Sequence, residues 1–284
     1  MRVAYYPGCS LEGTAKEYDD SIRAVMKKLG VELVEIPDWN CCGASSAHML
    51  DPEITVKLPW RNLKQAELLN ETEIMIPCAA CFARMKHAQK EVTNDAAKYG
   101  LEPPGKNFKI VHIHEFLSDK EFLKKIEAAK ELDISKLRAA PYYGCLSLRN
   151  PKLLDVDVRE AENPTSMESI LEAAGATVLE WSYKTDCCGG NLAVPKTNIQ
   201  KRMSQKIFDA AMYVEANAIV TDCPMCQINL DMRAEEIGAT EGKRYNIPVL
   251  YLTEVLALSF GIADKLWWNK HFVNPKPIFA GIGL

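Results

Sequence analysis

The residues of this sequence that could do chemistry are its ten cysteines. They form two sets of five with the same order: a single cysteine, an adjacent pair and a Cys-x-x-Cys pair. The first set is Cys9, Cys41, Cys42, Cys78 and Cys81, and the second is Cys145, Cys187, Cys188, Cys223 and Cys226. The spacing matches as well, with gaps of 31 and 35 residues in the first set and 41 and 34 in the second. This regularity predicts that each set forms one site for metal or redox chemistry.

Three kinds of site use clustered thiols. Zinc normally takes four ligands, so a zinc site would use four thiols of a set and spare one. Five thiolates around one dication would leave a charge of about −3 in an apolar crevice, which is costly. A disulfide framework fits poorly because each set has an odd number of cysteines, which would leave one of them unpaired. Cubane iron–sulfur clusters take four thiolates at compact spacing, whereas a more extended iron core could use a fifth. Gly43 and Gly189, which follow the adjacent pairs, would let the backbone approach such a core closely.

The sequence around the cysteines also repeats. "YYPGC" at 5–9 matches "YYGC" at 142–145, and "CCGASSA" and "IMIPCAAC" match "CCGGNLA" and "IVTDCPMC". A repeat of this length predicts duplication of a whole domain, because each unit is too long for a solenoid repeat. We therefore divide the chain into domains 1–137 and 138–284, with 146–164 as an insertion special to the second.

Each half alternates strand and helix signals. Strands are expected at "RVAYY", "VELVEI", "EIMIP" and "KIVHI" in the first half, and at "APYYG", "ATVLEW", "AIVTD" and "PVLYL" in the second. A helix is expected around 61–70, after the first cysteine pair. The pattern predicts an α/β fold of two tandem Rossmann-like halves, each with a mostly parallel sheet, related by a pseudo-twofold duplication. Every cysteine then lies just beyond a strand's carboxyl end, where open α/β sheets bind ligands, so each set should gather in one crevice.

The overall composition argues against several classes of protein. A chain of 284 residues with 48% hydrophobic residues can bury a full core, and its net charge of −4 without a basic run argues against a nucleic-acid partner. The N-terminus lacks a signal-peptide pattern, and the apolar stretch 247–268 is interrupted by polar residues, so we expect a cytoplasmic chain that does not span a membrane. No glycine fingerprint for flavin or nicotinamide occurs, so neither cofactor is expected on this chain.

The pattern Cys…CysCysGly…Cys-x-x-Cys, present twice, resembles the cysteine-rich CCG domain found in the B-type subunits of heterodisulfide reductases, over essentially the whole chain. In that family each five-cysteine set is held to bind a non-cubane [4Fe-4S] cluster, made of two smaller clusters fused at a shared iron and sulfur. The resemblance implies one such cluster on each set, with all ten cysteines acting in catalysis through their clusters.

The resemblance also implies an activity and partners. The chain would be the catalytic subunit that cleaves a disulfide, of the coenzyme M–coenzyme B type or a related small disulfide, into two thiols with one electron from each cluster. A small ferredoxin-like [4Fe-4S] subunit would dock on it, and a flavin-containing subunit would lie behind that one. Two alternatives stay open: an electron-relay or scaffold subunit of another oxidoreductase, and a sulfur-oxidising relative that runs in the oxidative direction.

Basic residues that follow the cysteines are candidates for positioning an anionic thiol or disulfide substrate. They are His48, Arg84, Lys86, Arg149, Lys152, Lys196 and Arg202. For each one alone, a solvated surface position is the ordinary alternative. For His112 and His114 we expect core packing or a backbone hydrogen bond. The aromatic segment 266–277 is expected to clamp over the sheet, with subunit docking as the alternative.

Overall fold

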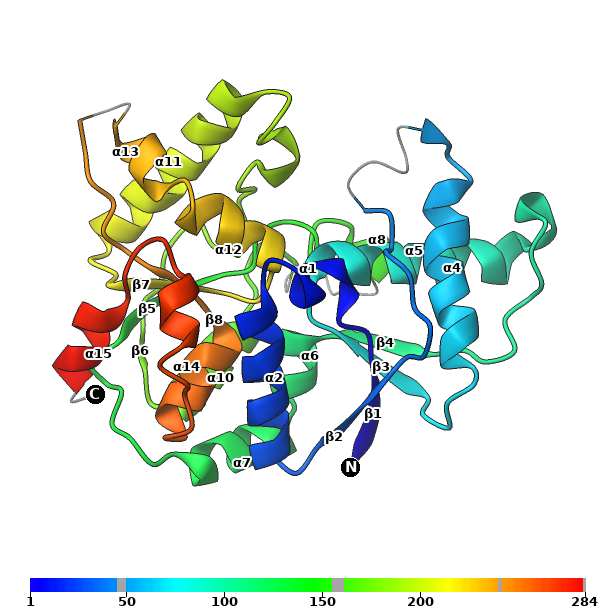
Figure 1. Cartoon of the computed structure of the whole chain (residues 1–284), viewed down its shortest axis with the longest axis horizontal. Coiled ribbons are helices and arrows are strands. Elements are labelled where there is room, and N and C mark those ends of the chain that lie inside the picture. The colour runs from blue at the N-terminus through cyan, green and yellow to red at the C-terminus, as the bar shows by residue number, and fades with distance from the viewer. Residues whose placement is uncertain (45–49, 155–160, 240–241, 283–284) are drawn as a thin grey trace.

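The computed structural model describes residues 1–44, 50–154, 161–239 and 242–282 (Figure 1). Two four-stranded parallel sheets carry the fold, in the orders β2-β1-β3-β4 and β6-β5-β7-β8. The first half contains β1 (Arg2–Tyr5), α1 (Gly8–Glu12), α2 (Lys16–Lys28), β2 (Glu32–Glu35), α4 (Ile54–Ala66), β3 (Glu73–Ile76), α5 (Ala79–Asp95), η1 (Ala97–Tyr99), β4 (Lys109–His112), α6 (Ile113–Leu117) and α7 (Lys120–Ala129). The second contains β5 (Arg138–Tyr142), α8 (Pro151–Leu154), α10 (Ser166–Ala174), β6 (Thr177–Val178), η2 (Gly190–Leu192), α11 (Thr197–Tyr213), β7 (Ala218–Thr221), α12 (Pro224–Asp231), α13 (Ala234–Ala239), β8 (Val249–Tyr251), α14 (Leu252–Ser259), η3 (Trp267–Lys270) and α15 (Lys276–Ile282).

The predicted α/β fold with parallel sheets is confirmed, and the two sheets repeat the same strand order. In both halves the first strand lies beside the second and third, and the fourth strand extends the sheet beyond the third. All carboxyl ends of a sheet therefore lie along one edge. The division at residue 137 stays a prediction; β5 begins at Arg138.

The helix after the first cysteine pair begins earlier than predicted. Helix α4 starts at Ile54 and ends at Ala66, and its buried stripe includes Val56, Trp60 and Leu63. Pro59 lies inside this helix, where proline lacks the N–H that a helical hydrogen bond needs. The sequence alone therefore favoured a start beyond the proline, whereas packing of α4 against α5 outweighs the missing bond.

The two halves share one core through crosswise helix contacts. Helix α2 of the first half packs on α14 of the second (Figure 1). In the same way, α10 of the second half packs on α6 of the first. At the first of these contacts the rings of Tyr18 and Tyr251 stack, with centroids 4.0 Å apart. Beside them the hydroxyls of Ser21 and Thr253 lie 2.7 Å apart. The exchange of equivalent contacts is consistent with the predicted pseudo-twofold relation.

The aromatic C-terminal segment packs onto the second half as a clamp. Trp267 and Trp268 are buried, and the ring of Trp268 lies 4.3 Å from that of Phe279. The backbone N–H of Phe272 donates to the Asp231 carboxylate at 2.7 Å, and His271 Nε2 lies 3.0 Å from Glu254 Oε1. These polar contacts tie the segment to α12 and α14.

We expect His271→Phe to lower the free energy of unfolding by about 3–5 kcal/mol near pH 6, because it leaves two buried carboxylates without their counter-charge. Burial alone would lower the pKa of His271, but Glu254 and then Asp231 raise it to about 9. Since the folded pKa is above the unfolded value of about 6.5, this stabilisation is complete below that pH and is lost as the pH rises through about 9. Thermal unfolding of both proteins across this range tests the prediction. A difference in stability between the wild type and His271→Phe that stays constant from pH 6 to above pH 9 would contradict it.

Candidate metal centres

The first five cysteines converge at the carboxyl edge of the first sheet. Cys9 lies in α1 directly after β1, and Cys41 and Cys42 lie in the loop after β2. Cys78 is the N-cap residue of α5, and Cys81 lies in the first turn of that helix. Cys9 Sγ is 3.7 Å from Cys41 Sγ, and Cys42 Sγ is 3.1 Å from Cys81 Sγ. Folding thus brings together thiols that are spread over about seventy residues of sequence.

The second set has the same arrangement on the second sheet. Cys145 follows β5, Cys187 and Cys188 follow β6, and Cys223 is the N-cap residue of α12. Cys188 Sγ lies 3.6 Å from Cys226 Sγ, which matches the contact between the corresponding cysteines of the first set. All ten cysteines are free thiols.

Each set has an outer side and a buried floor. In the first set the outer thiols, Cys9 and Cys41, are exposed. In the second set the outer thiols, Cys145 and Cys187, are half-buried. The other six cysteines are buried. A small molecule in solution would therefore reach each site at its single cysteine and at the first cysteine of its adjacent pair.

The two sets approach each other at their floors, where the Cys223 thiol lowers the pKa of Cys78 across the two halves. The hydroxyl of Tyr18 lies 2.8 Å from the carbonyl oxygen of Asp222 and 3.5 Å from that of Pro77. These carbonyls belong to the residues just before Cys223 and Cys78. One buried tyrosine therefore holds both Cys-x-x-Cys loops against each other.

A buried tyrosine also lies under each set. Tyr6 donates its hydroxyl to the Asn40 carbonyl at 2.7 Å, and Tyr142 donates to the Asp186 carbonyl at 2.6 Å. Both acceptors are the residues just before the adjacent cysteine pairs. Burial, and then the nearby thiolate charge, raise the pKa of both tyrosines, so each stays a protonated donor. Sequence analysis missed this role, although Tyr-x-Gly-Cys occurs at the start of both sets and could have revealed it.

We expect Tyr142→Phe to speed the release of metal from the second set several-fold, because the turn before Cys187 loses a hydrogen bond worth about 1 kcal/mol. The rate of metal transfer to a chelator measures this. Tyr245→Phe is the matched control, since Tyr245 donates to Asp209 at 2.8 Å on a different part of the second half. Equal release rates in the wild type and Tyr142→Phe would show that the hydroxyl does not support the site.

Glycines let the backbone pass close to the sulfurs. Gly8 and Gly144 have φ of +74° and +66°, and a Cβ at these positions would lie 3.1 Å from Cys81 Sγ and 2.9 Å from Cys226 Sγ. The predicted glycines, Gly43 and Gly189, also have positive φ, and their N–H groups donate to the sulfurs of Cys41 and Cys187 at 3.5 and 3.3 Å. Their role in approaching a cofactor stays a prediction.

The thiols of a set cannot all ionise without a cation. Hydrogen bonds with Cys41 and then Cys81 lower the pKa of Cys42 to about 4, while the hydrogen bond with Cys42 and then burial raise the pKa of Cys41. In the second set, the hydrogen bond with Cys145 lowers the pKa of Cys187 to about 6, and the same bond raises the pKa of Cys145. Ionisation of one sulfur thus keeps its neighbour protonated. A bound metal would supply the positive charge that lets the remaining thiols ionise.

The donor atoms fit a soft metal core larger than one ion. All-sulfur sites select zinc, copper(I) or iron–sulfur clusters. Among the described residues, no three cysteine sulfurs gather as closely as a single ion requires. The arrangement therefore suits an extended core that several sulfurs can grip from different sides.

Two of the predicted basic residues lie close enough to a set to act on it. Besides the hydrogen bonds from Cys41 and Cys81, the charge of Arg84 lowers the pKa of Cys42. Besides the hydrogen bond from Cys145, the charge of exposed Arg149 lowers the pKa of Cys187. A role in positioning substrate stays a prediction for both.

The other basic candidates differ in their placement. Lys196 is the exposed N-cap residue of α11, and Arg202 is exposed on that helix. The Lys86 ammonium donates to the Leu154 carbonyl at 2.6 Å and lies over the Phe82 ring, so it supports the packing of α8 on α5. His48 and the side chain of Lys152 lie outside the described residues.

Comparison with known proteins places this geometry among redox subunits. The model of the cysteine-rich domain family CCG matches residues 3–86 and 139–231, one match around each set. The 8-methylmenaquinol:fumarate reductase membrane anchor subunit of Wolinella succinogenes is 32% identical over 280 residues, which cover 95% of this chain and 96% of that protein. The B subunit of the ferredoxin/F(420)H(2)-dependent CoB-CoM heterodisulfide reductase of Methanosarcina acetivorans is 24% identical over 295 residues, covering 99% of this chain and 97% of its own length.

A solved structure shares the fold. A hypothetical protein from Helicobacter pylori superposes with a TM-score of 0.73 at 12% identity over 96% of this chain, which spans 52% of that protein. Within the part of the chain that the structure describes, no helix combines the length and apolar character needed to cross a lipid bilayer. With two matched cysteine-rich domains and near full-length similarity to the B-type subunits of heterodisulfide reductases, the chain belongs to the CCG family of cysteine-rich-domain proteins and is a member of it that resembles those subunits.

Proposed function

We propose that this chain is the iron–sulfur component at which a heterodisulfide-reductase-type complex interconverts a small disulfide and two thiols. The single observation that carries the proposal is the pairing of the two sets: the Tyr18 hydroxyl joins the loops that carry Cys78 and Cys223, and the outer thiols of both sets are exposed or half-buried. A protein that only relays electrons needs no such opening at both sites.

Each set would hold one non-cubane [4Fe-4S] cluster through its five cysteines. Three features of the chain support this cofactor: the odd fifth thiol, the sulfurs spread too widely for one zinc ion, and the glycines that leave room beside Cys81 and Cys226. When bound, the clusters would supply one electron each to the disulfide. The overall change is balanced when the disulfide takes up two electrons and two protons and leaves as two thiols.

The residues around the openings would bind and orient the substrate. The charge of Arg84 acts on the first set and that of Arg149 on the second, so each set would have a guanidinium to attract an anionic thiol or disulfide. Lys196 and Arg202 add positive charge on α11 beyond the second set. The proposed substrate class is therefore a low-molecular-weight disulfide of anionic thiols, with the coenzyme M–coenzyme B disulfide as the type case.

The electrons would come from partner subunits. Relatives of this chain are named as the B and D subunits of heterodisulfide reductases, which indicates multi-subunit complexes for those proteins. We propose a small ferredoxin-like [4Fe-4S] subunit that docks on this chain, followed by a flavin-containing subunit. If the purified chain alone reduced a disulfide with a nicotinamide, this part of the proposal would be wrong.

A second candidate is an electron-relay subunit of another oxidoreductase. The 32% identity to a subunit of 8-methylmenaquinol:fumarate reductase favours it, because this value exceeds the 24–25% identity to the heterodisulfide reductase subunits. In a relay protein no thiol binds. The same chemistry run in the oxidative direction, which joins thiols or oxidises sulfane sulfur, differs only in the potentials of the partners.

Electron paramagnetic resonance of the anaerobically purified chain separates these candidates. Under oxidising conditions, a new paramagnetic signal that appears only with an anionic thiol supports the disulfide chemistry. We expect Arg149→Gln to raise about tenfold the thiol concentration that gives half of the maximal signal, because the variant loses a charge-assisted hydrogen bond to the thiol. Arg2→Gln, which removes an exposed arginine at the start of β1, is the control. Full iron content with no response to any thiol would favour the relay.

A further inference from the structure

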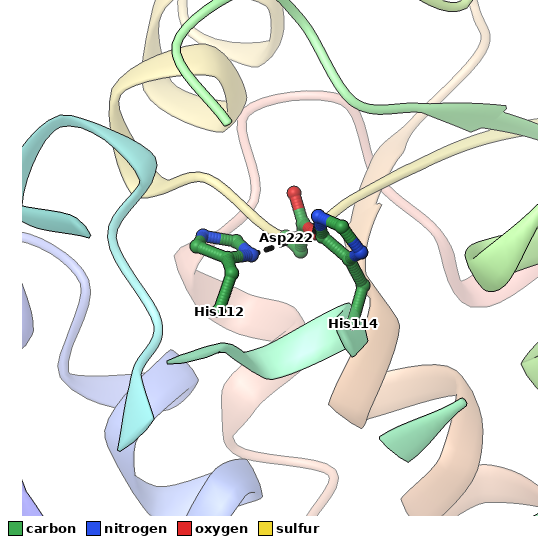
Figure 2. Close-up of side chains that lie close together, drawn as sticks. All are labelled: His112, His114 and Asp222. Atoms are coloured by element: carbon green, nitrogen blue, oxygen red, sulfur yellow. Dashed lines mark ion pairs between the residues drawn. The ribbon is translucent and has the colours of Figure 1, made fainter. Parts of the chain in front are cut away.

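Three polar side chains form a buried group where the two halves meet. His112 ends β4 and is the N-cap residue of α6, and His114 lies in the first turn of that helix. Asp222 comes from the other half, between β7 and Cys223. Their exposed fractions are 0%, 2% and 0%. Figure 2 shows Asp222 between the two imidazole rings.

Both histidines approach one oxygen of the aspartate. His112 Nδ1 lies 3.2 Å and His114 Nε2 lies 3.9 Å from Asp222 Oδ2. One ligand atom from each of the three side chains can be chosen so that all lie within 4.8 Å of one another. Ligands at about 2.0–2.2 Å from one divalent ion lie about 3–4 Å apart. The 3.2 and 3.9 Å separations between the histidines and Asp222 fall in this range, and a small movement would bring all three atoms onto one ion.

Hydrogen bonds do not account for this arrangement. Among the described residues, neither ring nitrogen of His112, nor His114 Nε2, nor either carboxylate oxygen of Asp222 has a hydrogen-bond partner. Unpaired polar atoms at such depth are rare, and a buried carboxylate without donors is costly. His112 Nδ1 and Asp222 Oδ2 form an ion pair at 3.2 Å when the ring is protonated, but this pair still leaves His114 Nε2 and Asp222 Oδ1 without a hydrogen-bond partner.

The surroundings prepare His114 for this role. Its Nδ1 lies 2.9 Å from the Ser166 hydroxyl, which comes from α10 of the second half. A histidine ligand usually forms such a bond through its other nitrogen, which fixes the ring and its tautomer. The Glu115 carboxylate accepts the backbone N–H of His112 at 2.9 Å and fixes the turn that carries both histidines.

We propose that His112 Nδ1, His114 Nε2 and Asp222 Oδ2 bind one divalent first-row transition metal ion, separate from the two five-cysteine sets. Two imidazoles and a carboxylate suit zinc or ferrous iron. Because the histidines belong to the first half and the aspartate to the second, the ion would cross-link the halves beside Cys223. The inference uses no sulfur ligand and does not depend on the proposed disulfide chemistry.

Metal and sulfide analysis of the anaerobically purified full chain tests this site. A [4Fe-4S] cluster contains one acid-labile sulfide per iron. The number of zinc and iron ions per chain minus the number of sulfides therefore gives the number of metal ions bound outside the clusters. We expect about one such ion per chain in the wild type, after incubation with zinc alone and removal of free metal. His114→Ala and Asp222→Asn should retain less than about a tenth of it, while His87→Ala, at a half-buried histidine of α5, should retain all of it. Equal excess metal in the wild type and both variants would overturn the proposal.

X-ray absorption at the zinc edge of the wild type gives a test that does not depend on how the variants fold. A first shell of nitrogen and oxygen at about 2.0–2.1 Å supports the site, and a shell with sulfur at about 2.3 Å overturns it by placing the zinc on cysteines. Sulfide measured in the same sample keeps the proposals apart. A nitrogen and oxygen shell in a chain without sulfide would support this site and refute the clusters.

Discussion

Gly144→Ala is expected to lose the metal of the second five-cysteine set, so that the iron and acid-labile sulfide of the chain fall to about half. The new methyl group would lie 2.9 Å from Cys226 Sγ, and the backbone there has φ of +66°. Cys226 is held in the first turn of α12 and its sulfur lies 3.6 Å from Cys188 Sγ, so it cannot move aside without leaving the set. Gly8→Ala should affect the first set in the same way, with a contact of 3.1 Å to Cys81 Sγ.

Gly100→Ala separates this contact from backbone strain. Gly100 has φ of +62°, and a Cβ there would meet nothing within 4 Å. Both substitutions carry the left-handed backbone penalty of about 1–2 kcal/mol, but only Gly144→Ala adds the contact with sulfur. We therefore expect the loss of iron only at Gly144, together with a larger loss of thermal stability there than at Gly100. Full iron content in Gly144→Ala, or the same loss in Gly100→Ala, would contradict the account of the site.

Cys78→Ala is expected to remove the metal of the first set and to change the spectrum of the second. The Cys223 thiol lowers the pKa of Cys78, and Tyr18 holds the two loops together, so removal of the Cys78 thiol alters the surroundings of a ligand in the other half. Cys9→Ala is the matched control, because Cys9 lies at the exposed end of the first set beside Cys41. Both variants should lose about half of the iron, and in a complex that needs both clusters their turnover should fall at least about 100-fold.

Mössbauer spectra of the iron that remains distinguish the two variants. With Cys9→Ala we expect the second set to keep its wild-type spectrum, and with Cys78→Ala we expect that spectrum to shift. Identical spectra in the two variants would show that the sets do not communicate through Cys78 and Cys223.

The sequence was sufficient to predict the fold class and where the cysteines would gather. Strand and helix periodicity depends on local patterns of apolar residues, and parallel strands place their carboxyl ends at one edge. Cys9 and Cys81 could therefore be expected in one crevice without knowledge of the tertiary packing. The start of α4 was mispredicted because Pro59 disfavours a helix locally while tertiary packing supports it.

The contact between the two sets could not be predicted in this way. It depends on how α2 docks on α14 and on the burial of Tyr18 between the Pro77 and Asp222 carbonyls, and a repeat in the sequence does not specify how its copies pack. The structure agrees with the expectation that His112 and His114 are buried. Asp222, which lies 108 residues after His114, gave no sequence signal that would link it to them.

The basic residues show a similar limit. Lys86 and Arg84 both follow Cys81, yet their interactions differ. The Lys86 ammonium donates a hydrogen bond to the Leu154 carbonyl, whereas the charge of Arg84 lowers the pKa of Cys42. Their positions on α5 differ by two residues, which turns them to different sides of the helix. Sequence order alone cannot assign such roles before the neighbours of the helix are known.

Acid-labile sulfide per chain, measured on protein purified without oxygen, tests the central claim most directly. Two five-cysteine sets that each bind a [4Fe-4S] cluster predict about eight sulfides per chain. A chain that carries zinc or disulfides on these cysteines, with no inorganic sulfide, would contradict it.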